Sequence, residues 1–160
     1  MPETPEPPPR VPAAAAPHSP IITETEPNTG LAILAGLLAC VVGAVIWAVI
    51  TVVTHVQIGW VAIGVGFLVA WSVRTFGKGR SQAFGVIGAV LALLGCALGN
   101  LLSASAFLAE ARAEPVMSTI LQVLGDPQLA TRLMQASFNA MDLVFYAIAA
   151  YEGFKFARRP

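Results

Sequence analysis

Two polar residues inside long apolar segments, Asn100 and Asp142, are the side chains in this sequence best placed to do chemistry. A polar group costs free energy in hydrocarbon, so such residues often mark substrate or proton sites. A hydrogen bond between helices and a carboxylate at the lipid interface are the simpler roles for the two. We expect both in the outer third of the membrane at similar depth, and we treat them as one candidate polar site.

Other signals of chemistry are weak. His18 and His55 stand alone, and the two cysteines, Cys40 and Cys96, lie in uninterrupted apolar runs without a second ligand at metal spacing. The segment at residues 77–80, Gly-Lys-Gly-Arg, resembles a phosphate loop but lacks both the preceding strand and the Ser or Thr after the lysine. The formal net charge is zero, so no overall field attracts nucleic acid. We therefore expect no enzyme activity, no cofactor, no metal and no nucleic-acid partner.

The amino-acid composition indicates the kind of fold that would hold Asn100 and Asp142 in place. Of 160 residues, 56% are hydrophobic and 11% are charged. A soluble domain of this size would lack the charged surface that water requires, so the bilayer is the expected solvent. We predict an all-α, polytopic membrane protein.

Residues 1–30 differ from the rest, because they hold most of the prolines together with a short alanine run. Proline favours extended geometry, and this segment cannot bury enough apolar surface to become ordered. We predict a disordered, Pro-rich tail. A polyproline ligand at residues 9–12 is the alternative interpretation.

The remaining residues, 31–158, predict a four-transmembrane-helix bundle. The first apolar stretch has 24 residues, about 36 Å as a helix and enough to cross a ~30 Å hydrocarbon core. The last is the least apolar, because it contains Asp142 and Glu152. The expected spans are residues 31–54, 58–73, 83–108 and 138–156.

Residues 110–137 form the sizeable polar connection. Pro115 and Gly125 are placed to open and close one helix, and Asp126-Pro127 reads as the start of a second. An apolar stripe from Leu129 to Met141 predicts that this second helix runs on into the last span. We expect an outer amphipathic loop that lies on the outer leaflet or covers the bundle, with a binding lid as the alternative.

Small residues recur every fourth position on the second and third spans, which places them on one face of each helix and allows close approach of backbones. We expect the two faces to meet. Their members are Ala62, Gly66 and Ala70 on the second span, and Gly88, Ala92, Gly95, Gly99 and Ser103 on the third.

The basic residues predict how the chain is oriented across the membrane. The predicted spans divide Lys and Arg between the two sides of the membrane as seven against two, with Arg112 and Arg132 as the minority. The positive-inside rule then puts both termini in the cytoplasm. Six of the majority would anchor the inner surface: Arg74, Lys78, Arg80, Lys155, Arg158 and Arg159.

Several short segments of the chain resemble a group of uncharacterised small bacterial inner-membrane proteins with four predicted spans. The residues that carry the likeness are Ile58-Gly59-Trp60, Gly64-Val65-Gly66, Val73-Arg74, Gly77-Lys78-Gly79, Phe84-Gly85-Val86-Ile87-Gly88 and Asp142-Leu143-Val144-Phe145. The resemblance covers about residues 31–158. It implies a bacterial inner (cell) membrane and the four-span architecture, and it brings no activity.

Two function classes remain. One is a structural or accessory membrane protein that packs with itself or with a partner membrane protein. The other is a subunit of a small oligomeric transporter or channel, in which Asn100 and Asp142 would line the path.

Overall fold

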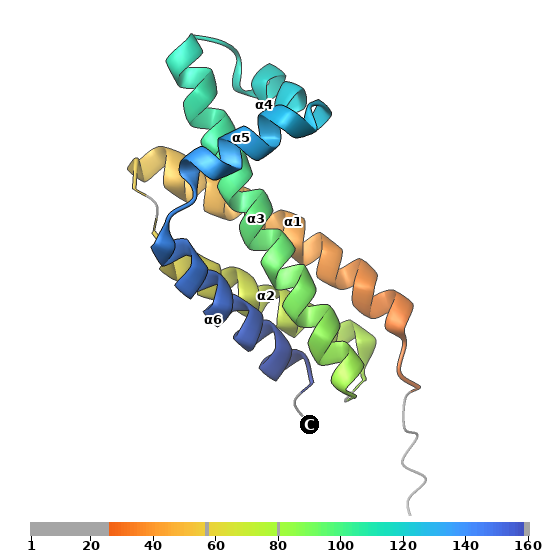
Figure 1. Ribbon diagram of the computed structural model, residues 1–160. Helices are drawn as coiled ribbons and strands as arrows, with labels where there is room; N and C mark the ends of the chain where they lie inside the picture. The colour runs from red at the N-terminus through yellow and green to blue at the C-terminus, as the bar shows by residue number, and fades with distance from the viewer. Residues whose placement is uncertain (1–25, 57, 80, 159–160) are drawn as a thin grey trace, which may run out of the picture.

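The computed structural model describes residues 26–56, 58–79 and 81–158 (Figure 1). This part of the chain is entirely helical, without strands. Its six helices, in chain order, are α1 (Thr29–Thr54), α2 (Trp60–Gly77), α3 (Gln82–Arg112), α4 (Val116–Gly125), α5 (Pro127–Ser137) and α6 (Ala140–Ala157).

Three of these helices, α1, α2 and α3, are long and apolar enough to cross a membrane. The number of candidate spans rises to four if α5 and α6 are counted as one broken span, with a bend of 103° between them. On α1, large apolar side chains point outward, with Leu38 70% and Val53 75% exposed. An uncharged helix that exposes such side chains requires lipid around it. The protein is therefore a membrane-embedded helical protein.

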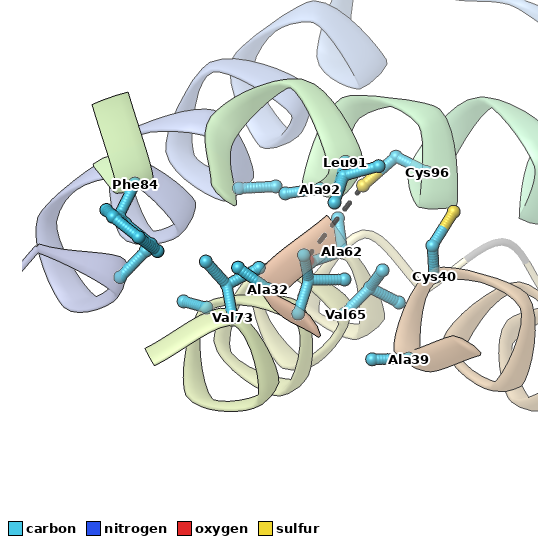
Figure 2. Close-up of a cluster of buried hydrophobic side chains, with 14 of the residues drawn as sticks. Ala32, Ala39, Cys40, Ala62, Val65, Val73, Phe84, Leu91, Ala92 and Cys96 are labelled. Atoms are coloured by element: carbon cyan, nitrogen blue, oxygen red, sulfur yellow. Dashed lines mark hydrogen bonds between the residues drawn. The ribbon is translucent and has the colours of Figure 1, made fainter. Parts of the chain in front are cut away.

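The bundle is built around the α2–α3 pair. These two helices contact each other, and both also contact α1 and α6. As a result α1 and α6 lie on opposite sides of the pair, as Figure 1 shows with α1 in orange and α6 in dark blue. Small side chains fill the core between them. Figure 2 shows the thiol of Cys96 on α3 pointing toward the carbonyl of Ala62 on α2, at an Sγ to O distance of 4.0 Å.

The two ends of the bundle differ. At the end that we call the basic end, α1 begins, α2 turns into α3 and α6 finishes (Figure 1). The backbone N–H of Asn28, which caps α1, donates to the carbonyl of Gly77 at 2.9 Å. At the other end, the loop end, α1 turns into α2, and α4 and α5 pack against α3.

The helix that reaches farthest beyond the bundle is α3. Its 31 residues make a rod of about 46 Å, longer than the ~30 Å hydrocarbon core. Of the other helices, α4 contacts only α3 and α5, so the protruding part of α3 carries the loop helices.

Several predicted boundaries shift in the structure. The second span was expected to end at residue 73, but α2 continues through Arg74 to Gly77 and stops where Lys78 adopts the left-handed conformation at φ 52°. The third was expected to end at residue 108, but α3 continues to Arg112. Charged side chains mark the edge of the lipid and do not end a helix. The first helix begins at Thr29, so the last two residues of the predicted 1–30 tail are helical.

The predicted continuous stripe from Leu129 to Met141 is wrong. The chain leaves the helix at Phe138, and α6 starts anew after Asn139. The Asn139 side chain accepts from the backbone N–H groups of Met141 and Asp142, while Asp142 Oδ2 accepts from the Asn139 N–H at 2.9 Å. This capping box fixes a new helix start and permits the bend.

Candidate functional site

The small-residue face of α2 packs against α6. Ala62, Gly66 and Ala70 are all buried. At Gly66, a Cβ atom would lie 2.7 Å from the carbonyl oxygen of Ala149 and 3.0 Å from its Cα, so the two backbones are in direct contact. Only a residue without a Cβ fits there.

The face of α3 serves two partners. At the basic end, Gly88 meets Gly153 of α6 so closely that an added Cβ on either would clash with the other's carbonyl oxygen. Ala92, one turn further along α3, lies over the same glycine of α6. This half of the α3 face therefore packs against α6.

The other half of the α3 face contacts both α1 and α2. An added Cβ on Gly95 would lie 2.8 Å from Val65 Cγ1 on α2 and 3.5 Å from the Cys40 carbonyl oxygen on α1. Gly99 leaves room for the Trp47 side chain, because an added Cβ would lie 3.0 Å from the Trp47 Cβ. Ser103 is buried, and its hydroxyl donates to the Gly99 carbonyl at 2.8 Å. The small faces of α2 and α3 were expected to meet each other. Of their glycines, however, Gly66 and Gly88 pack against α6 and Gly99 packs against α1. The helices are rotated toward those neighbours.

Sequence reasoning missed a third small face, which lies on α6. Ala149, Gly153 and Ala157 recur every fourth residue and are all buried. Gly153 would place a Cβ 2.7 Å from the Gly88 carbonyl oxygen. The spacing was readable in the sequence, but the charged residues of the segment drew attention to its polar character instead.

The structure places both residues of the candidate polar site beside Tyr146. Asn100 is buried, with 2% of its surface exposed, and it interacts with Tyr146 of α6. The Tyr146 hydroxyl donates to the Cys96 carbonyl of α3 at 3.1 Å. Tyr146 therefore ties α6 to α3 across the bundle interior.

Asp142 is also buried, at 4% exposure, and lies one helical turn before Tyr146, with which it interacts electrostatically. Its carboxylate accepts from the Asn139 N–H as part of the α6 capping box. Asn100 and Asp142 therefore both lie beside Tyr146. In addition, Asp142 caps the start of α6.

Two further polar groups are buried on α1, and one of them, the Trp47 indole, lies beside Tyr146. The Trp47 ring packs edge-on against the Tyr146 ring, with centroids 6.5 Å apart. The indole N–H of Trp47 and the hydroxyl of Thr51, one turn later, are fully enclosed and have no hydrogen-bond partner within the described residues.

The predicted inner anchors gather at the basic end. Arg74 lies in the last turn of α2, and Lys78 caps that helix. Lys155 Nζ lies 5.2 Å from the centroid of the Tyr151 ring, and the Arg158 guanidinium lies 4.7 Å from that of Phe154. The two remaining anchors, Arg80 and Arg159, and residues 1–25 of the predicted tail, lie outside the described residues.

Within the described ranges, no three His, Cys, Asp or Glu side chains gather in a way that could hold a metal ion. Cys40 and Cys96 are both buried and not joined in a disulfide. Comparisons of the chain with protein-family models, with curated proteins and with solved structures found no match. The geometry of the bundle is thus the basis for a functional proposal.

Proposed function

We propose that this chain is a structural or accessory membrane protein, which packs with itself or with a partner membrane protein. The observation that carries the proposal is the backbone contact of α6 with both central helices, at Gly66 with Ala149 and at Gly88 with Gly153. In lipid, helices associate through such close small-residue contacts. At these two points the backbone of α6 is in direct contact with the backbones of α2 and α3.

The alternative is a small oligomeric transporter or channel subunit. The buried group of Asn100, Tyr146 and Asp142 favours it, because polar residues within spans commonly line transport paths. The two classes place different demands on the same chain. A transporter loses activity on Asn100→Ala or Asp142→Asn while it accumulates normally. An accessory protein tolerates both substitutions and fails to assemble on Gly95→Leu or Gly99→Leu.

We place the chain in a bacterial inner membrane with both termini in the cytoplasm. The support for this orientation is that Arg74, Lys78, Lys155 and Arg158 share one end of the bundle with the start of α1. A reporter active only outside the cytoplasm should be silent when fused after Pro160 and active when inserted between residues 110 and 135. The reverse pattern contradicts the orientation. We propose no enzymatic role, no cofactor and no nucleic-acid partner.

Purification in mild detergent from the native membrane tests the functional proposal. The native mass and every co-purifying protein are recorded together. A stoichiometric foreign subunit, or a stable homo-oligomer that moves no solute in vesicles, supports the accessory or structural role. A homo-oligomer that moves a solute in vesicles, and loses this activity on Asn100→Ala, establishes the transport alternative instead.

A further inference from the structure

We propose that the interior of the bundle at the loop end holds ordered water, hydrogen-bonded to the Trp47 indole N–H and the Thr51 hydroxyl. Both groups are buried, with 0% and 2% of the residue surface exposed, and neither has a partner within the described residues. A buried donor without a partner is strongly disfavoured, and internal water is the usual solution where the surroundings are polar.

Both residues lie on the part of α1 that packs against α3, a contact region that we call the seam. Trp47 packs on Gly99 of α3, and His55 stacks near Phe107 of α3 with ring centroids 6.0 Å apart. The same register of α1 against α3 therefore holds on both sides of Thr51. In this register Thr51 lies level with Ser103, one turn of helix from the Trp47 contact.

The seam is polar on its other sides as well. Asn100 and Ser103 of α3 are buried, and Tyr146 of α6 reaches the Cys96 carbonyl. The Ser103 hydroxyl donates to Gly99, so its oxygen still has capacity to accept. A water molecule needs two to four polar partners, and the indole, the two hydroxyls and nearby carbonyls supply them.

The architecture explains why water reaches this level and not the core below. Gly95 and Gly43 pack on Val65, so in that layer α1, α2 and α3 are in close contact. α2 begins only at Trp60, so the level of Thr51 and Ser103 lies near its start, with α1, α3 and α6 as the principal walls. Water at this level lies close to the loop end of the bundle.

The test is nuclear magnetic resonance of the full chain in lipid nanodiscs, with 15N-labelled indoles. Trp47→Phe assigns the Trp47 indole signal. We expect a cross-peak between the Trp47 indole proton and water that is weakened at least severalfold by Thr51→Val, which replaces the hydroxyl with a methyl of similar size. Thr54→Val is the matched control, because the exposed Thr54 hydroxyl donates to the Ile50 carbonyl of its own helix. It should leave the cross-peak unchanged.

The equilibrium constant for unfolding gives a second, independent readout. If water bridges Thr51, the valine breaks a satisfied network and raises the unfolded fraction, by about fivefold for one lost hydrogen bond. If the seam is dry, the valine removes an unsatisfied hydroxyl and lowers that fraction. An indole proton without a water cross-peak, together with a more stable Thr51→Val protein, overturns the proposal.

Discussion

Replacement of Gly153 by alanine tests whether close backbone contact holds α6 in the bundle. The added Cβ would lie 2.7 Å from the Gly88 carbonyl oxygen and 3.0 Å from the Cβ of Ala92. Carbon and carbonyl oxygen atoms rarely approach closer than about 3.3 Å, so α6 must move away from α3 by roughly 0.6 Å. The obstructing atom belongs to a backbone, which cannot rotate aside as a flexible side chain does.

Overpacking of this kind costs about 1–3 kcal/mol in the free energy of unfolding. Gly64→Ala is the matched control: Gly64 lies within α2 and an added Cβ there would have no neighbour within 4 Å. We expect this control to be neutral or stabilising by up to about 1 kcal/mol, because alanine is a better helix former than glycine. Reversible unfolding in mixed micelles, followed by circular dichroism or by a pair of labels on α3 and α6, measures both values.

A double-mutant cycle sharpens the result. Gly88→Ala should be destabilising as well, because its Cβ would meet the Gly153 carbonyl oxygen and the Ala157 Cβ. Once one alanine has separated the helices, the second meets less resistance, so the two losses should add to more than the loss in the double variant. The reasoning is refuted if Gly153→Ala is as stable as Gly64→Ala, or if the two alanines act independently.

Two further outcomes follow from individual hydrogen bonds. Tyr146→Phe removes the donor to the Cys96 carbonyl and should cost about 1 kcal/mol in the free energy of unfolding. The exposed Tyr151→Phe serves as its control, and equal effects from the two would contradict the cross-helix role of Tyr146. Asp126→Ala removes the acceptor for the N–H groups of Gln128 and Leu129 at the start of α5. We expect it to weaken that helix by about 1 kcal/mol, visible as faster amide hydrogen exchange confined to α5. Unchanged exchange there would show that the cap contributes nothing.

Hydropathy predicted four spans, and three of them are helices long and apolar enough to cross a membrane on their own. An apolar segment of this length has no other stable conformation in lipid. The cap at Asp126-Pro127 was equally readable, and its side chain does accept the N–H groups of Gln128 and Leu129. Both predictions rest on local chemistry. A local signal was also overlooked, since Asn139 followed by Asp142 three residues later is a capping pair.

The choice of partner for each small face could not be read from the sequence. Spacings of four, three and four residues show that Gly88 and Gly99 share a face of α3, but the first meets Gly153 on α6 and the second meets Trp47 on α1. That difference depends on the crossing angle and rotation of three helices. The polar site shows the same limit, because Tyr146 joins Asn100 only once α6 has docked.

The composition of α6 has a consequence for how the protein enters the membrane. With Asp142, Glu152 and Lys155 among 18 residues, α6 does not reach the apolar character of α1, α2 or α3 on its own. Its buried positions, Ala149, Gly153 and Ala157, complement a groove that α2 and α3 create together. We therefore expect insertion to be sequential: α1, α2 and α3 enter the bilayer first, and the α2–α3 pair then draws in α6, which alone would stay at the surface.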